Sequence, residues 1–185
     1  MNRIFKSMAV LFMAAATMLT FSCKKDNTST SEGGDGSFVT AKGDFTYKIN
    51  LNSSSVTAIT KAYDVFIDYY DADGTIKSST EITPSNLTWE KTVSKTSFPA
   101  WFGVRLRLVP KSDLSGVTDS DDLKLNGKVE LNGKYTSKAG KTREVYKSND
   151  IIKNGVDPHN GTTYTTQVRC QVLANGERET FVDWE

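Results

Sequence analysis

Histidine and cysteine, which carry much of enzyme and metal chemistry, are scarce in this sequence. His159 is the single histidine among 185 residues, and Cys23 and Cys170 are the two cysteines. Nucleophilic triads need a base beside the nucleophile. His159 lies in the turn-like stretch Asp157–Gly161, so we expect a surface-loop histidine and no enzyme of this type. Three such residues cannot complete a four-ligand zinc site, and we expect neither a metal nor a cofactor. The sequence does not exclude a pair of catalytic carboxylates of the glycosidase type, because the distance between two such groups depends on the fold.

An excess of charge of one sign is also lacking. The chain has 23 Lys and Arg against 22 Asp and Glu. Residues 1–22 carry Arg3 and Lys6 and no acid, so the rest has 21 basic (23 − 2) and 22 acidic residues, a net charge of −1. Nucleic-acid binding shows as a basic excess, so we expect no nucleic-acid partner.

No apolar run near the N-terminus is long enough to span a membrane. Met8–Phe21 is mainly apolar and uncharged over 14 residues, whereas a spanning helix needs about 20. Arg3 and Lys6 precede this run. A basic start followed by a short apolar run is typical of an export signal, and we assign residues 1–22 to one.

The end of this signal resembles the lipobox of bacterial lipoproteins. Ser22 stands directly before Cys23, and Leu19 stands four residues before it. The resemblance implies cleavage before Cys23 and diacylation of its thiol, which would anchor the protein by lipid alone. Lys24 in place of Asp after Cys23 implies the outer membrane, and the Lys/Asp-bearing segment looks like the surface-export tags of Bacteroidetes lipoproteins. The alternative is an ordinary signal peptide, after which Cys23 could pair with Cys170.

The next stretch lacks apolar residues almost entirely. Residues 23–43 are rich in Ser, Thr, Gly, Asp and Lys, and such a segment cannot offset the entropy of ordering. We interpret residues 23–43 as a lipid anchor and flexible tether. Residues 44–185 are of the size of a single domain.

The domain lacks the long apolar stretch of period 3.6 that helical and α/β folds need. Apolar residues instead alternate with polar ones, which indicates short strands. The predicted strands are Asp44–Leu51, Val56–Tyr70, Thr75–Ile82, Leu87–Lys95, Ala100–Val109, two pieces within Leu123–Thr136, Thr142–Lys147, Thr162–Leu173 and the segment after Asn175-Gly176. This spacing predicts an all-β antiparallel sandwich or barrel. We prefer an immunoglobulin-like sandwich, with a lipocalin-like barrel as the alternative.

Glycine-containing turns divide these strands. Asp71–Gly74 is predicted to turn the chain between two strands. Asn126-Gly127 and Asn132-Gly133 each predict either a hairpin or a bulge. Asn175-Gly176 predicts a two-residue turn that pairs Ala174 with Glu177 and places Cys170 opposite Phe181.

One part of the domain looks like small Bacteroidetes lipoproteins of uncharacterised function. The similar region runs from Tyr63 to Val109 and includes the Asp71–Gly74 turn, Trp89 and Phe98–Gly103. The resemblance covers much of the domain and carries no catalytic motif.

Two groups of tryptophan and arginine are the candidate ligand-binding residues. Alternation places Trp101 with Arg105 and Arg107 on one strand face. The predicted pairing of Trp184 with Gln167 in the last hairpin places Trp184 on the same face as Arg169. Aromatic rings stack on sugar rings, and arginine adds bidentate hydrogen bonds, so we expect a glycan or protein ligand. The alternative is that each tryptophan only shields a strand, with arginine stacked on it. In that case Arg105 and Arg107 also pair with Asp64 and Asp68.

Two further features have structural interpretations. Asp71 and Asp73 do not form a complete calcium loop, because the EF-hand spacing fails, and we favour a simple hairpin turn. Cys170 is expected to be a small, unreactive core residue. The sequence thus predicts a non-catalytic binding module, with a structural subunit of a surface assembly or a carrier of a small apolar ligand as alternatives.

Overall fold

The described part of the chain consists mainly of β-strands. The computed structural model describes residues 38–52, 56–118, 123–153, 156–180 and 184. Within these residues the elements are β1 Thr40–Leu51, α1 Val56–Ala62, β2 Tyr63–Tyr70, β3 Ile76–Ser79, β4 Thr88–Lys95, β5 Ala100–Pro110, β6 Leu125–Ser137, β7 Thr142–Lys153, the 3-10 helix η1 Pro158–Asn160, β8 Tyr164–Val172 and β9 Arg178–Thr180.

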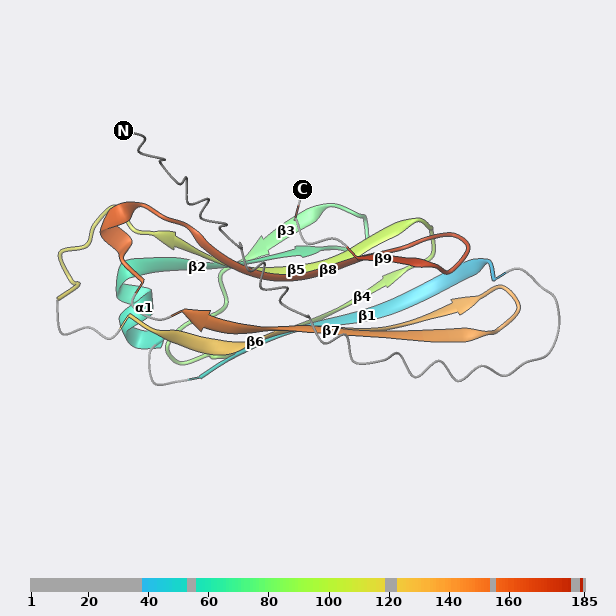
Figure 1. Cartoon of the computed structure of the whole chain (residues 1–185), viewed down its shortest axis with the longest axis horizontal. Coiled ribbons are helices and arrows are strands. Elements are labelled where there is room, and N and C mark those ends of the chain that lie inside the picture. Colours follow the sequence, from blue (N-terminus) through green and yellow to red (C-terminus); the bar gives the residue numbers. More distant parts are fainter. Residues whose placement is uncertain (1–37, 53–55, 119–122, 154–155, 181–183, 185) are drawn as a thin grey trace, which may run out of the picture. The chain divides into compact units, whose positions relative to one another are not determined.

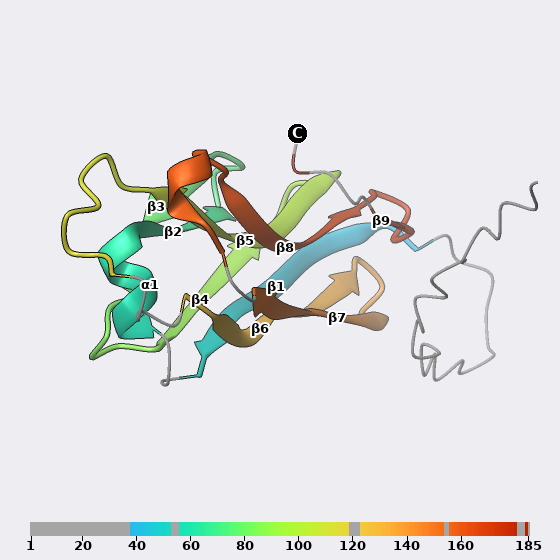
Figure 2. The same ribbon diagram turned by 60° about the vertical axis from the view of Figure 1, so that its left-hand side comes forward.

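The strands form two antiparallel sheets that pack face to face. One sheet has the order β4-β1-β6-β7 and the other β3-β2-β5-β8-β9. The two sheets lie one above the other, and α1 lies at one end of them (Figure 1, Figure 2). The predicted all-β fold with two packed sheets is confirmed. The lipocalin-like barrel is wrong for the described residues, because each sheet ends in two edge strands instead of closing on itself.

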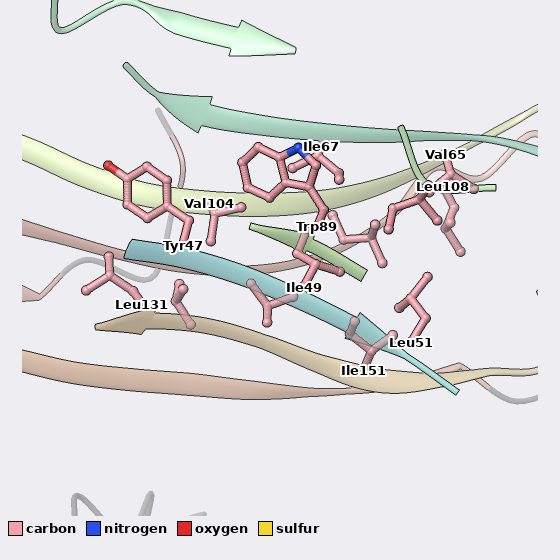
Figure 3. Close-up of a cluster of buried hydrophobic side chains, with 14 of the residues drawn as sticks. Tyr47, Ile49, Leu51, Val65, Ile67, Trp89, Val104, Leu108, Leu131 and Ile151 are labelled. Carbon is pink, nitrogen blue, oxygen red and sulfur yellow. The ribbon is translucent and has the colours of Figure 1, made fainter. Parts of the chain in front are cut away.

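Strand alternation determines which side chains form the core between the sheets. In β5 the predicted inward face is confirmed: Phe102, Val104, Leu106 and Leu108 are all at most 2 % exposed. Side chains from both sheets meet there, and Figure 3 shows Tyr47 and Ile49 of β1 with Ile67 of β2 and Val104 of β5 among them. Burying one such aliphatic or aromatic side chain stabilises the fold by about 1.5–3 kcal/mol.

The folded region begins earlier than the predicted domain boundary. β1 starts at Thr40, and its backbone N–H donates to the Ala174 carbonyl at 2.8 Å. Gly43 pairs with Lys95 of β4 and Tyr135 of β6. Residues 40–43, which the sequence assigned to the tether, therefore belong to the sheet. The predicted signal, Cys23 and the first part of the tether lie outside the described residues.

The predicted strand Val56–Tyr70 is two elements. Its first part is the helix α1, in which Val56, Ile59 and Ala62 are buried. Their spacing of three places them on one helical face, whereas alternation resumes only in β2. The prediction was wrong because a seven-residue helix is too short to show a repeated helical period.

Neither Asn-Gly pair of the sixth strand makes a turn or a bulge, and both predictions were wrong. β6 runs unbroken from Leu125 to Ser137 and pairs with β7 in one register as far as Lys153. A side chain at Gly127 would meet the Asn50 carbonyl at 2.3 Å, and one at Gly133 would meet the Phe45 ring at 2.1 Å. These glycines allow a neighbouring chain to approach closely, which is a known role of glycine inside strands.

The last hairpin has a different register from the predicted one. The Leu173 N–H donates to the Glu177 carbonyl at 2.9 Å, which leaves three residues in the loop instead of two. Gly176 has φ 75, as a three-residue hairpin loop with a left-handed glycine requires. As a result Cys170 pairs with Thr180, and the predicted pairing with Phe181 is wrong.

Two buried tyrosines provide a matched test of the core. The Tyr47 hydroxyl donates to the Tyr70 carbonyl at 3.0 Å, whereas the buried Tyr63 hydroxyl has no hydrogen-bond partner in the described part of the chain. Tyr47→Phe is expected to lower the free energy of unfolding by about 1–1.5 kcal/mol, because it removes a buried hydrogen bond. Tyr63→Phe is expected to be neutral or stabilising, because it removes an unsatisfied group. Urea denaturation of both variants measures this difference, and equal losses would contradict it.

Candidate functional site

The outward side of the five-stranded sheet carries an unusual set of aromatic and charged side chains. Alternation turns this set away from the core between the sheets. We call it the outer aromatic–arginine face; its members are Phe66, Asp68 and Tyr70 of β2, Trp101, Arg105 and Arg107 of β5, Arg169 of β8, and Trp184.

The strand register brings these residues into neighbouring positions. Asp68 pairs with Arg105, and Phe66 pairs with Arg107. Gly103 pairs with Arg169, so that a position without a side chain lies beside the arginine. The face is therefore built from three adjacent strands that are far apart in the sequence.

Asp68 holds the charged half of the face together. This aspartate is 1 % exposed and accepts hydrogen bonds from Arg105 Nη2 at 2.8 Å, Arg107 Nε at 2.9 Å and Ser78 Oγ at 2.6 Å. Burial by itself would raise the pKa of Asp68, but the hydrogen bonds from Arg107, Ser78 and Arg105 outweigh it and lower the pKa. The predicted pairing of both arginines with Asp68 is confirmed.

The predicted pairing of these arginines with Asp64 is wrong. Asp64 pairs with Val109 in the register, near the far end of β5, and its exposed carboxylate lies 3.9 Å from Lys111 Nζ. Asp64 and Asp68 lie on the same side of β2, and the strand register determines that only Asp68 lies beside the arginines.

Arginine and aromatic rings alternate in the other half of the face. The Arg169 guanidinium lies 3.8 Å from the ring centroid of Trp101 and 5.5 Å from that of Tyr70. Arg105 lies 4.9 Å from the centroid of the Trp184 ring, and the Tyr70 and Trp184 rings are 5.1 Å apart. These distances are those of cation–π contacts and ring packing.

The structure thus gathers all five candidate ligand-binding residues into one cluster. The sequence placed Trp101, Arg105 and Arg107 apart from Arg169 and Trp184, but Tyr70 contacts rings of both groups. Sequence reasoning missed Tyr70 and Phe66 as members of the site. The alternation of Phe66, Asp68 and Tyr70 in β2 was the available signal.

Exposure divides the cluster into a covered and an accessible part. Tyr70, Arg169 and Trp184 are 6–7 % exposed, whereas Trp101 is partly exposed, and the Arg105 and Arg107 side chains are 23 % and 29 % exposed. Part of the face therefore fits the shielding interpretation, in which a ring covers the strand and arginine stacks on it. The accessible part contains the indole of Trp101 and the guanidinium groups of Arg105 and Arg107, which can stack on a ring and donate hydrogen bonds.

An open pocket of about 240 Å³ lies at the other end of β2. Its lining includes Thr60, Asp64, Ile82 and Lys111, and Lys111 Nζ donates to the Thr60 carbonyl at 2.6 Å. None of the five candidate residues lines this pocket.

The remaining sequence candidates have structural surroundings. His159 is exposed in η1. Asp73 Oδ1 accepts from the backbone N–H and the hydroxyl of Thr75 in the predicted turn. Cys170 is fully buried, and burial raises the pKa of its thiol to about 12, as expected for an unreactive core cysteine. Within the described ranges, no three His, Cys, Asp or Glu side chains form a group that could hold a metal ion.

Neither a membrane-spanning helix nor a likeness to known proteins adds to this description of the site. In the part of the chain that the structure describes, no helix has the length and apolar character needed to cross a membrane. Comparison of the chain with protein-family models, curated proteins and solved structures found no match.

Proposed function

We propose that this protein is a non-catalytic binding module, anchored to the outer membrane by lipid at Cys23 and binding a glycan or protein ligand. The ligand surface is the outer aromatic–arginine face, with Trp101 as its accessible ring and Arg105 and Arg107 as its donors. The tether after Cys23 would hold this surface clear of the lipid headgroups, facing either the periplasm or the cell exterior.

The observation that carries the proposal is the contrast between the two outer faces. The outer side of the four-stranded sheet is mainly polar apart from Tyr146 and Ile152 of β7; on it Lys48 Nζ lies 2.9 Å from a Glu90 oxygen, and the Thr46 and Thr92 hydroxyls are 3.0 Å apart. Such a face is typical of a solvated surface. Aromatic rings and arginines, which are enriched in binding sites, gather on the five-stranded sheet instead.

A screen of the folded domain tests this proposal. The wild-type domain is applied to a glycan array and used in pulldowns from the cells that produce it, with heat-denatured domain as the control. We expect at least one ligand that the folded domain retains and the denatured domain does not. A screen with no such ligand would count against a binding module.

The lipid anchor has its own test. Mass spectrometry of the membrane-extracted wild type is expected to show Cys23 as an acylated N-terminus. Cys23→Ala is expected to be released from the membrane, because two acyl chains anchor a protein stably and this variant carries no acyl chain. An unmodified chain released from the membrane would contradict the anchor. Cys23 would then be available for pairing with Cys170.

A structural subunit of a surface assembly is the second proposal. It is supported by the edge strand β7, where Tyr146 and Ile152 are 57 % and 63 % exposed, because exposed apolar residues on an edge strand favour pairing with another chain. Crosslinking in membranes is expected to give defined larger species in this case, and only monomers if the proposal is wrong.

A carrier of a small apolar ligand has less support, since the inward rings of the two sheets stack on each other, with 3.5 Å between the Phe45 and Phe102 centroids.

For the fold, the immunoglobulin-like class stays a proposal. Two packed antiparallel sheets support it. In the constant-type immunoglobulin arrangement the first strand lies at a sheet edge, whereas β1 here lies between β4 and β6, which argues for a different strand order.

A further inference from the structure

Trp184 occupies a site on the outer aromatic–arginine face. Its ring packs on Tyr70 with centroids 5.1 Å apart and receives the Arg105 guanidinium at 4.9 Å. The residue is 7 % exposed, yet neither Trp184 nor Tyr70 belongs to the core cluster between the sheets. The site is therefore a separate ring-binding site on the outside of the sandwich.

The described surroundings of Trp184 leave one of its polar atoms unpaired. Its buried indole Nε1 has no hydrogen-bond acceptor among the described residues. A buried donor without an acceptor is unfavourable, and nearly all buried polar groups in folded proteins are paired. An aromatic ring whose polar group is satisfied would bind the same site more favourably than Trp184 does.

The charge of the cluster indicates the surroundings that such a ring should have. Among the described members of the face, Arg105, Arg107 and Arg169 stand against one acid, Asp68, which gives a formal charge of +2 from three positive groups and one negative. In the sequence Trp184 stands between Asp183 and Glu185. The residue that occupies the site thus comes from an acidic segment, as the charge of the cluster favours.

We propose that the site formed by Tyr70 and Arg105, beside Arg169 and Trp101, binds an aromatic side chain within an acidic segment of a partner protein. Trp184 fills the site in the free protein and is displaced when the partner binds. This inference rests on the proposed binding function and selects a protein ligand over a glycan. Arg105 lies over a ring face, and a cation–π contact needs a π system, which a sugar ring lacks.

The test uses a fluorescein-labelled peptide with the sequence Val-Asp-Trp-Glu and an amidated end, and fluorescence anisotropy measures its binding. Trp184→Ala is expected to bind this peptide at least tenfold more tightly than wild type, because the wild-type site is already filled. A peptide with Ala in place of Trp is expected not to bind. Raising the salt concentration is expected to weaken binding, because the attraction is partly electrostatic.

Trp184→Leu is the second variant, since it keeps an apolar cover on Tyr70 if Trp184→Ala does not fold. Circular dichroism and thermal unfolding establish that each variant is folded. Arg105→Lys in the Trp184→Ala background keeps the charge beside Asp68 but removes the planar group, and it is expected to weaken peptide binding at least threefold. Lys48→Arg, on the polar face of the other sheet, is the matched control and is expected to leave binding unchanged.

A folded Trp184 variant that does not bind the peptide at millimolar concentration would overturn the inference. Equal affinities of the wild type and the variants would overturn it as well. If the screen of the wild-type domain yields a ligand but the peptide does not bind, the proposed binding function is retained and only the proposed site for an aromatic side chain is wrong.

Discussion

Asp68→Ala is expected to lower the free energy of unfolding by about 2–3 kcal/mol. The substitution removes the carboxylate that accepts from Arg105, Arg107 and Ser78 and leaves two guanidinium groups side by side. Breaking a fully buried ion pair costs about 3–5 kcal/mol, and the partial exposure of both arginine side chains places this case below that range. Urea denaturation at neutral pH measures the loss.

Asp64→Ala is the matched control for this prediction. Asp64 lies on the same side of β2, but it is exposed and its nearest partner is Lys111 at 3.9 Å. Removing such a surface pair costs about 0–1 kcal/mol. If Asp68→Ala and Asp64→Ala lose the same stability, the paired arginines do not stabilise the fold.

The pH dependence of the Asp68→Ala effect follows from the lowered pKa of Asp68. A carboxyl group whose pKa is lower in the folded state than in the unfolded state stabilises the fold at pH values above the unfolded pKa of about 3.9. This stabilisation is lost as the pH falls through the folded pKa. The stability difference between wild type and Asp68→Ala is therefore expected to be constant from pH 7 to pH 5 and to shrink below about pH 4. A difference that grows on acidification would contradict this assignment.

Gly133→Ala is expected to destabilise the protein by about 3 kcal/mol, at the upper end of the usual cost of overpacking. The added Cβ would lie 2.1 Å from Phe45 Cδ1, and Phe45 is fully buried and stacked on Phe102. The ring can move only by disturbing the contact between the two sheets. Chemical denaturation measures this loss of unfolding free energy. A loss below about 1 kcal/mol would show that the Phe45 ring can move aside at little cost, which would contradict the prediction.

Two variants control this prediction. Gly116→Ala adds a methyl group where nothing lies within 4 Å, and it is expected to change stability by less than about 0.5 kcal/mol. Phe45→Leu removes the ring that the new methyl group meets. Combined with Gly133→Ala, it is expected to give a loss smaller than the sum of the two single losses by about 1 kcal/mol or more. Additive losses would mean that Phe45 is not the group that Gly133 accommodates.

Most of the strands and their faces could be predicted because alternation is a local property. The inward face of β5 is an example, since each second residue from Phe102 to Leu108 is apolar. The role of Gly133 could not be predicted, because the ring that it accommodates comes from β1, far away in the sequence. An Asn-Gly pair has the same sequence whether it forms a hairpin turn or lies in a strand under an aromatic ring. Only the neighbouring strand, here β1 with Phe45, distinguishes the two cases.

The candidate site shows the same division. Residue types indicated Trp101, Arg105, Arg107, Arg169 and Trp184 as candidate binding residues. Their assembly into one cluster depends on the order β2-β5-β8 in the sheet, which no local pattern reveals. The register likewise pairs Arg105 with Asp68 instead of Asp64, although both acids have the same alternation.

The central claim is that the outer aromatic–arginine face is the ligand surface, and the most direct measurement is the affinity of two single variants for a ligand obtained with the wild-type domain. Trp101→Ala removes the accessible ring of that face, whereas Tyr146→Ala removes an exposed ring from the other sheet. Truncating a central aromatic residue of a binding site typically costs about 2 kcal/mol or more, so Trp101→Ala is expected to weaken binding about 30-fold and Tyr146→Ala to leave it unchanged. If Tyr146→Ala abolishes binding and Trp101→Ala does not, the ligand binds to the four-stranded sheet and the claim is wrong.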